Sequence, residues 1–436
     1  MPGSCPPRVY LHIGEPKTGT TFVQQAMWAN RARLAAQGVM LPGYSHRDHS
    51  RASRDLREAP RLAGDPAAPW TGEWDVLTGQ ALRAPGVAVI SDEVLAACNP
   101  PQADRGIRSL LSAEVQVILT VRDIGSLLRA EWQETVKCRG TTDWGRWLAD
   151  VIAAGPAADR RRRAWFWAVH DTIAILQMWS RHIPPDHVHV ITVPRQGPPE
   201  ALWARFASVV GIDSSSIDVP SARVNSSLGL AEAEFLRRMN QALPDGMPDW
   251  FYTRNIKRIL AHHVLSARPS GPRLALPSAE QAWASEQAEI LVAALRDSKY
   301  HIVGDLTDLL PLPATGRYVA PAGVPAQQLL DTAVHAAAAL AEHQYRESHP
   351  AVPQPRNPGS PRQKASQLEW TVLNGRWTRR VLRNASHLAP VRRLRVLIWC
   401  LLMHPARHRP GPVSGNDLDN RRDEDKTRPP ARAVSG

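Results

Sequence analysis

Residues Gly14 to Thr21 read Gly-Glu-Pro-Lys-Thr-Gly-Thr-Thr and combine groups that bind an anion. They follow an apolar run that begins at Arg8 and precede a pattern typical of a helix. A loop that joins a buried strand to a helix N-terminus directs backbone N–H groups and the helix dipole at one place. Gly14 and Gly19 permit the tight backbone that this requires, and Lys17 adds a cation. The segment therefore predicts a site for phosphate or sulfate.

The position of the lysine distinguishes this loop from that of the nucleoside triphosphatases. Their loop reads Gly-x-x-x-x-Gly-Lys-Ser/Thr, with the lysine directly after the second glycine. Here Thr20 occupies that position, and Lys17 precedes Gly19 by two residues. The two glycines keep the spacing of the triphosphatase loop, but the lysine stands at position 17 and not at position 20.

The six residues from Pro16 to Thr21 resemble the 5′-phosphosulfate loop of the sulfotransferases that use 3′-phosphoadenosine-5′-phosphosulfate (PAPS), whose motif is Pro-Lys-Ser/Thr-Gly-Thr-Thr/Ser. The resemblance implies that Lys17 stabilises the phosphate oxygen that gains charge as the S–O bond breaks, which lowers the energy of the transition state more than that of the ground state. It also implies PAPS as the co-substrate, without magnesium. The residues that would bind its phosphosulfate are Pro16, Lys17, Thr18, Gly19, Thr20 and Thr21.

A second apolar run, Val87 to Ile90, ends in Ser91-Asp92-Glu93. Related carbohydrate sulfotransferases place a glutamate general base after this strand, and this implies that Glu93 deprotonates the acceptor, with Asp92 as the alternative. A triphosphatase would use the same pair for magnesium and water. A third interpretation is a cluster that caps a helix. All three stay open at this stage.

A third run, Val115 to Val121, leads into Arg122. The resemblance implies that Arg122 binds the 3′-phosphate, since a guanidinium can hold a phosphate with two hydrogen bonds. The family places a serine eight residues later, but position 130 is alanine, so Ser126 is the substitute that we predict. A local ion pair between Arg122 and Asp123 is the alternative.

Further segments, 121–137, 223–229 and 300–306, look like a bacterial subgroup of the same family, so that the resemblance covers about residues 8–311. In the wider family a late basic loop closes over the nucleotide. Arg223 is the candidate for this contact, with Asn225 and Ser226 beside it, and a plain turn that starts a helix is the alternative.

Continuous apolar runs indicate strands that are covered on both faces, and helical patterns separate them here. This order predicts a parallel sheet with right-handed crossovers: a P-loop-like three-layer α/β fold, its central parallel sheet flanked by helices, with a helical C-terminal extension. We predict strands at 8–14, 87–90, 115–121 and 187–193, and helices at 20–37, 103–112, 124–138, 142–154, 164–182, 199–210, 230–243, 250–266 and 280–297.

Composition changes predict where the parts of the chain begin and end. A sulfotransferase domain would span residues 1–320 with its core at 8–311, followed by a helical extension at 321–348. We then expect a proline-rich linker at 349–367, a helical segment rich in tryptophan and arginine at 368–404, and a disordered tail at 405–436.

The net charge of +12 comes with no recognisable nucleic-acid module, so we expect no nucleic-acid partner. The 4 cysteines have no metal-ligand spacing, and the histidines form no metal motif. No apolar signal core precedes the first strand, and the apolar run 396–403 is too short to span a membrane. We expect a cytoplasmic protein without a metal, in contact with a membrane surface at most through 368–404.

Two histidine segments could line an acceptor site. His46 and His49 lie in a polar stretch that would suit a substrate loop, and His170 and Asp171 lie in an aromatic segment that would line the acceptor pocket or pack as an ordinary helix. The sequence thus favours transfer of a sulfuryl group to a hydroxyl or amine of a small-molecule, glycan or lipid-linked acceptor. The alternatives are a P-loop nucleoside triphosphatase or kinase, and an inactive sulfotransferase-like binding protein.

Overall fold

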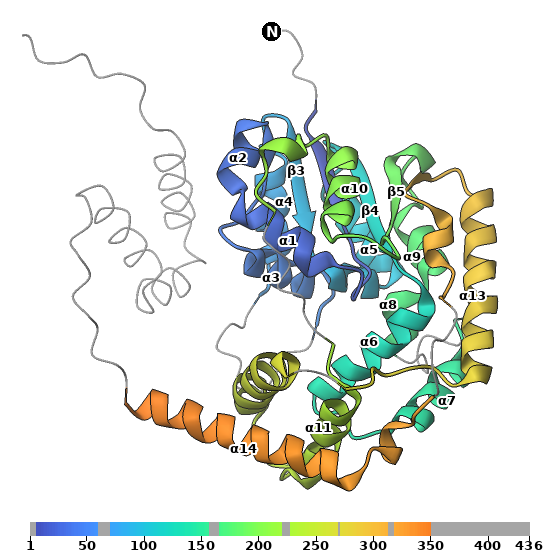
Figure 1. Cartoon of the computed structure of the whole chain (residues 1–436). Helices are drawn as coiled ribbons and strands as arrows, with labels where there is room; N and C mark the ends of the chain where they lie inside the picture. Colours follow the sequence, from blue (N-terminus) through green and yellow to red (C-terminus); the bar gives the residue numbers. More distant parts are fainter. Residues whose placement is uncertain are drawn as a thin grey trace, which may run out of the picture. The chain divides into compact units, whose positions relative to one another are not determined.

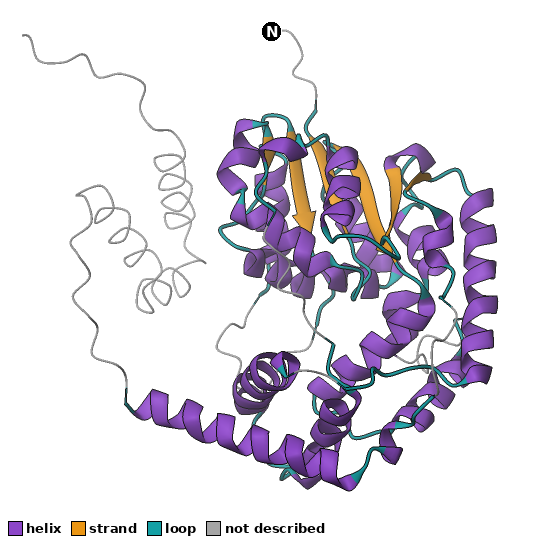
Figure 2. Cartoon of the chain, viewed as in Figure 1, coloured by secondary structure: helices purple, strands orange, loops and turns teal. Residues whose placement is uncertain are grey.

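The centre of the molecule is a six-stranded, fully parallel sheet with the order β2-β3-β1-β4-β5-β6 (Figure 2). The computed structural model describes residues 6–59, 70–156, 165–219, 227–268, 271–312 and 318–349. Helices cover both faces, which confirms the predicted three-layer α/β class. The strands are β1 (Arg8–His12), β2 (Val39–Met40), β3 (Val87–Ser91), β4 (Glu114–Val121), β5 (Val188–Thr192) and β6 (His301–Val303).

The four predicted strands are present, and the two outer strands were missed. β2 has 2 residues and β6 has 3, too few to show an apolar run that stands out from loops. Both lie at the edges of the sheet, where each pairs with a single neighbour. The interior strands are covered on both faces and are therefore mostly apolar. An edge strand can be short and can combine polar and apolar residues.

Alternate residues of the strands feed two separate cores. Side chains such as Tyr10 and Ile118 pack with one group of helices, and Leu11 and Val117 pack with the other. The first group is α1 (Thr20–Ala29), α2 (Arg31–Ala36) and α10 (Glu200–Val210). The second is α3 (His46–Leu56), α4 (Glu73–Ala81), α5 (Pro100–Arg108), α9 (Thr172–Trp179) and α13 (Ser278–Asp297).

A third core joins helices beyond the carboxyl ends of the strands and holds many of the tryptophans. Trp132 and Trp144 are fully buried there with ring centroids 5.4 Å apart, so these indoles serve packing. α14 lies along α11 in Figure 1. The elements are α6 (Ile124–Lys137), α7 (Trp144–Ala154), α8 (Trp165–His170), α11 (Leu230–Ala242), the π-helix η4 (Tyr252–Val264) and α14 (Ala326–Ser348), and the exposed helix α12 (Asp249–Phe251) directly precedes η4.

Two predicted helices are each divided by a polar residue. The predicted helix 20–37 consists of α1 and α2, which meet at Asn30, where the side-chain amide donates to Ala26 O at 2.9 Å. The predicted helix 164–182 consists of α8 and α9, and Asp171 between them caps α9 by accepting from Ala174 N. Asn and Asp compete with the helical backbone for hydrogen bonds, which favours a break at these places.

The substrate loop predicted around His46 and His49 is wrong, because this stretch is the helix α3. Ser45 and Asp48 form a capping box at its start, and Ala52 and Leu56 supply a small buried face. His49 is 1% exposed and its ring bonds to Pro42 O and to the backbone of Ser91. Burial lowers the pKa of His49 to about 4, so the imidazole is a neutral part of the core.

Residues 350–367 of the predicted linker 349–367, the basic segment 368–404 and the tail 405–436 lie outside the described residues. Among the helices that are described, none has both the length and the apolar composition that a membrane crossing needs.

Candidate functional site

The predicted phosphate loop connects β1 to α1 at the carboxyl edge of the sheet, where parallel α/β folds bind ligands. Gly14 has φ 108° and Gly19 has φ 84°, which disfavour a side chain. A Cβ on Gly14 would come within 2.8 Å of Glu93 O, and one on Gly19 within 2.4 Å of the Leu202 side chain. Both glycines are therefore required by backbone conformation and by close packing.

Two backbone hydrogen bonds extend the sheet into the loop. Glu15 N donates to Thr120 O at 2.8 Å, and Thr120 N donates to Gly14 O at 2.6 Å. The Thr18 hydroxyl is buried and donates to Glu15 O, with Thr120 Oγ1 at 2.6 Å. This hydroxyl stabilises the loop and already uses its hydrogen atom within it. A hydrogen bond from Thr18 to an anion would therefore come from its backbone N–H.

The remaining loop residues differ in exposure. Gly19 is the N-cap of α1, Thr20 is buried at its first position, and the Thr21 side chain is exposed. Pro16 and Lys17 are half-buried, and Lys17 has a left-handed φ of 63°. The structure thus brings the six predicted residues together at one helix N-terminus, where orphan N–H groups face an incoming anion.

Lys17 makes an ion pair that the sequence did not predict. Its Nζ lies 2.7 Å from Glu134 Oε2 on α6, and Lys257 Nζ from η4 lies 2.7 Å from the other oxygen of the same carboxylate. Burial alone would raise the pKa of Glu134, but the charges and hydrogen bonds of the two lysines hold it far below the usual range. Glu134 is thus an anion between two cations. No spacing signal could have shown this, since the partners lie more than 100 residues apart along the chain.

The two carboxylates after β3 have different surroundings. Asp92 is 4% exposed, accepts from Val94 N at 3.0 Å and from Ser50, and caps the 3-10 helix η1 (Glu93–Ala97). Burial first and the Glu93 charge second raise the pKa of Asp92 to about 6. Glu93 is half-buried, lies against the phosphate loop at Gly14, and accepts from Gln24 Nε2 at 2.9 Å. The cap interpretation therefore describes Asp92, while Glu93 is the better candidate for a base.

Three arginines gather at the carboxyl ends of β4 and β5 around a cavity of about 70 Å³. Arg122 Nη1 donates to Lys17 O at 3.4 Å, and its Nε lies 3.9 Å from Asp123. Ser126 also lines the cavity, and its hydroxyl accepts from Arg129 Nη2 at 2.9 Å. The third guanidinium, from Arg195, is oriented by a 3.0 Å bond to Leu310 O. Such a cavity suits a phosphate group.

Arg129 and Arg195 are site residues that sequence reasoning missed. Arg129 lies one helical turn after Ser126, so an i, i+3 search from the predicted serine would have found it. Arg195 follows β5 and has no signal of that kind. Arg223, the predicted closing-loop contact, lies outside the described residues, as do Asn225 and Ser226.

His170 lies inside the fold and connects the phosphate loop to α6. Its Nδ1 is 3.3 Å from Glu15 Oε2, and its Nε2 is 3.7 Å from Glu131 Oε2, with no exposed side-chain surface. Burial lowers the pKa of His170, but hydrogen bonds and charges from Glu131 and Glu15 outweigh this and raise it. His170, Asp171, Trp167 and Arg122 all line a cavity of about 310 Å³, and the ring nitrogens of His170 face its two carboxylates. This histidine therefore lies both in a packed helix and in the wall of a cavity.

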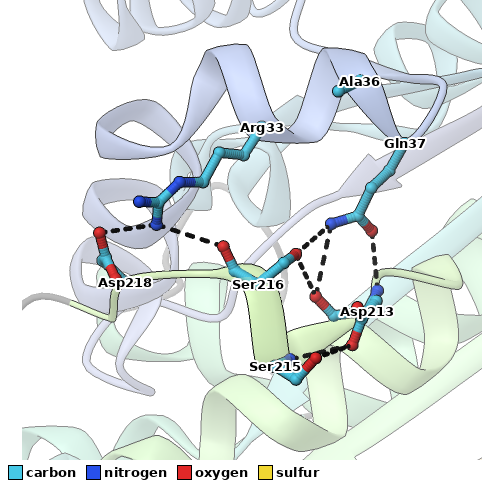
Figure 3. A pocket seen from close by; sticks show the side chains of 7 residues that line it. All are labelled: Arg33, Ala36, Gln37, Asp213, Ser215, Ser216 and Asp218. Carbon is cyan, nitrogen blue, oxygen red and sulfur yellow. Dashed lines mark hydrogen bonds and ion pairs between the residues drawn. The ribbon is translucent and has the colours of Figure 1, made fainter.

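A hollow of about 620 Å³ lies between α2 and residues 213–218 (Figure 3). It is at the amino ends of the strands, since the neighbouring Gly38 O accepts from Val87 N at the start of β3. Its polar groups bind one another: Gln37 Nε2 donates to Ser216 Oγ at 2.7 Å, and Arg33 pairs with Asp218 at 2.6 Å. Ligands of such folds bind at the opposite edge of the sheet, so this hollow is not the functional site.

Within the described ranges, no group of three or more histidine, cysteine, aspartate or glutamate side chains could hold a metal ion.

Comparison with known proteins gives little beyond the fold. No family model matches the chain, and no curated protein matches it. The crystal structure of a sulfotransferase from Alicyclobacillus acidocaldarius is similar with a TM-score of 0.33 and 15% identity, over 53% of this chain and 92% of that chain. A TM-score this low carries no argument about activity, so the function has to be argued from the residues themselves.

Proposed function

We propose that this chain is a sulfotransferase that moves a sulfuryl group from PAPS to a hydroxyl or amine of a small-molecule, glycan or lipid-linked acceptor. The observation that carries the proposal is the connection between two cationic sites at one edge of the sheet. Arg122, in the arginine cavity, donates a hydrogen bond to the backbone of Lys17 in the phosphate loop. A nucleotide with one anionic group at its 3′ position and another at its 5′ position would fit this arrangement.

In the proposed reaction, the acceptor oxygen or nitrogen attacks sulfur while the bond from sulfur to the bridging phosphate oxygen breaks. The electron pair of that bond passes to the phosphate oxygen, where Lys17 and the N-terminus of α1 stabilise the new charge. Glu93 accepts the proton of the acceptor. Lys17 pairs with Glu134 in the structure, so it would exchange this carboxylate for the donor oxygen during the cycle.

The triphosphatase alternative is less well supported by the same geometry. Position 20, which carries the lysine in that loop, is a buried threonine. Asp92, which would bind magnesium, is buried and serves as the cap of η1. A carboxylate that already accepts from a backbone N–H and a serine has fewer lone pairs left for a metal. Both observations favour a donor that needs no magnesium.

A binding experiment distinguishes these functions. Full-length protein would be titrated calorimetrically with 3′-phosphoadenosine-5′-phosphate (PAP) and, separately, with ATP and magnesium. We expect PAP to bind at least about tenfold more tightly, a difference of roughly 1.4 kcal/mol, because only PAP has the 3′-phosphate that the arginines would hold. A preference for ATP with magnesium would overturn the proposal.

A transfer experiment separates the enzyme from an inactive binding protein. Radiolabelled PAPS would be incubated with the protein and a panel of hydroxyl and amine acceptors, and mass spectrometry would identify any sulfated product. Transfer of label that depends on the protein supports the enzyme. Tight PAP binding without transfer to any acceptor class and without slow hydrolysis of PAPS would identify an inactive binding protein.

A further inference from the structure

The chain uses lysine sparingly, and half of its lysines lie at or near one carboxylate. It has six lysines, Lys17, Lys137, Lys257, Lys299, Lys364 and Lys426, among 53 lysines and arginines in total. Lys17 and Lys257 both pair with Glu134 at 2.7 Å. Lys137 lies one turn after Glu134 on the same helix and interacts electrostatically with Glu134, Lys17 and Lys257. We name the three lysines with Glu134 the lysine cluster.

The lysine cluster has more positive than negative charge. Two ammonium groups pair with one carboxylate, the third lies one helical turn away, and the other titratable neighbours add no balancing charge. Burial, together with Lys137, lowers the pKa of His262 to about 4, so this histidine is neutral near pH 7. Burial raises the pKa of the Cys138 thiol despite the nearby Lys257, so the thiol is neutral as well. Two positive charges therefore remain uncompensated.

This excess charge lies in partly buried surroundings, where it costs free energy unless an anion binds. Lys137 is 8% exposed, and among the described residues no hydrogen bond or ion pair engages its ammonium group. The side chains of Lys17 and Lys257 are each 28% exposed, so that a ligand can reach the cluster. Burial lowers the pKa of Lys137, as is expected for an ammonium that lacks a counterion of its own.

The position of the lysine cluster relative to the arginine cavity indicates which anion binds there. The cavity lies at the start of α6, at Asp123 and Ser126, and Lys137 is the last residue of this helix. A helix of 14 residues is about 20 Å long, at roughly 1.5 Å for each residue. Lys17 comes from the loop between these ends. A donor that uses the arginines and Lys17 for its two anionic ends leaves Lys137 and Lys257 unused.

We infer that Lys137 and Lys257 form an anion subsite for the acceptor, so that the preferred acceptor carries a carboxylate, sulfate or phosphate near the hydroxyl or amine that is attacked. This inference rests on the proposed function for the identity of the donor, but the subsite itself does not. Lysine suits it because a flexible point charge accepts several anion shapes, whereas arginine selects planar, bidentate ones. The subsite would also hold the acceptor group close to Lys17, which belongs both to the phosphate loop and to the lysine cluster.

The test uses full-length protein and three probes: PAP, PAPS and inorganic sulfate added to protein saturated with PAP. Dissociation constants would be measured at constant ionic strength, with chloride replaced by sulfate. The variants are Lys137→Gln and Lys257→Gln. Lys299→Gln is the matched control, because Lys299 is exposed between α13 and the start of β6, at the opposite edge of the sheet. Circular dichroism melting would confirm that each variant is folded.

We expect saturable sulfate binding to PAP-loaded protein, weakened at least about tenfold by Lys137→Gln and by Lys257→Gln and unchanged by Lys299→Gln, while PAP and PAPS affinities stay within about twofold. Weaker binding of PAPS together with sulfate would assign these lysines to the donor and overturn the inference. Sulfate binding that neither variant changes would identify a structural ion pair and overturn it too. Failure of PAP to bind would contradict the proposed function, yet lysine-dependent sulfate binding by the same protein would still support the subsite.

A second measurement addresses the acceptor directly. Transfer from labelled PAPS would be compared between glucuronate and glucuronamide, which share their hydroxyl groups and differ in that a neutral amide replaces the carboxylate. We expect a higher kcat/KM for glucuronate in the wild type and an equal, low value for both sugars in Lys257→Gln. A wild type that prefers glucuronamide, or a preference for glucuronate that survives in both lysine variants, would contradict an acidic-acceptor subsite.

Discussion

The two ends of α6 hold cations in different ways. At its start, each guanidinium of the arginine cavity already has a protein acceptor: Lys17 O for Arg122, Ser126 Oγ for Arg129 and Leu310 O for Arg195. At its end, the lysine cluster has three ammonium groups and a single carboxylate. The arginines are fixed by hydrogen bonds before any ligand arrives, whereas the lysines compete for one partner.

This difference indicates a division of labour along one helix. Groups that are held in place lose little entropy when they bind, which suits the anchoring of a nucleotide phosphate. Charges that share a partner can exchange it for a ligand, which suits a step in which negative charge moves. Substitutions at the start of α6 should therefore change donor affinity, and substitutions around its end should change the rate of transfer.

The largest effect is expected for Lys17→Ala. Removal of the cation that stabilises the leaving phosphate should lower kcat on the order of 10³-fold, about 4 kcal/mol, by analogy with the loss of one preorganised donor. The rate of transfer from labelled PAPS would be measured at saturating donor. PAP affinity should fall much less, so a variant with near-normal kcat would remove Lys17 from the transfer step.

Glu93→Gln should lower kcat by about 10²-fold or more, because an amide cannot accept the acceptor proton. The rate would be followed with the best acceptor from the screen, beside Asp92→Asn as the comparison. Asp92 is a buried cap, so its substitution should lower thermal stability while the folded fraction retains turnover. Normal turnover by Glu93→Gln would exclude it as the base.

At the start of α6, Arg129→Ala should weaken PAP binding by roughly 10- to 100-fold. This is the effect of losing a charged hydrogen bond of about 1.5–3 kcal/mol. Ser126→Ala should cost about threefold or less, since its hydroxyl serves mainly to orient Arg129. Calorimetric titration with PAP checks both values, and kcat at saturating PAPS should be retained. A larger loss for Ser126→Ala than for Arg129→Ala would restore the serine as the principal contact.

The middle of α6 predicts a pH dependence of stability. Because the partners of His170 raise its folded pKa above the unfolded value of 6.5, its stabilising contribution is complete below that value and is lost as the pH rises through the folded pKa. Urea unfolding from pH 6 to pH 9 should show this loss in the wild type. His170→Gln should lack this pH-dependent loss of stability. Subtracting its free energy of unfolding from that of the wild type at each pH cancels the contribution of Asp92, which both proteins share.

The control for this experiment is His182→Gln, since His182 is exposed and pairs only at the surface with Asp104. It should keep the pH dependence of the wild type. An identical profile in His170→Gln and the wild type would show that the link between the loop and α6 carries no charge.

The smallest effect is expected for Lys137→Gln on protein without ligand. Loss of one of the three ammonium groups, which leave an excess of two positive charges, should relieve repulsion, so the free energy of unfolding should stay within about 0.5 kcal/mol of the wild type or rise. Urea unfolding in a buffer of low ionic strength would measure it. A clear destabilisation would mean that Lys137 is a structural partner, and the contrast between the two ends of α6 would disappear.

Much of the fold followed from local patterns. Continuous apolar runs located β1, β3, β4 and β5, because a strand that is buried on both faces is mostly apolar. β2 and β6 escaped detection, since two or three residues at a sheet edge carry no such constraint. The sequence of α3 favours a loop, because its polar face dominates its composition and only a capping box and a narrow apolar face mark the helix.

The sequence by itself determined the direction of the sheet, the type of loop and the position of its lysine, because each of these depends on residues that are neighbours along the chain. Tertiary structure alone decided which partners the loop meets. Lys17 pairs with Glu134, which lies 117 residues later in the chain. His170 lies 155 residues after Glu15 and connects Glu15 to Glu131. Such pairs depend on how helices pack over the sheet edge, and this is set by the whole core. Packing therefore produced the lysine cluster, whose excess charge no local pattern could show.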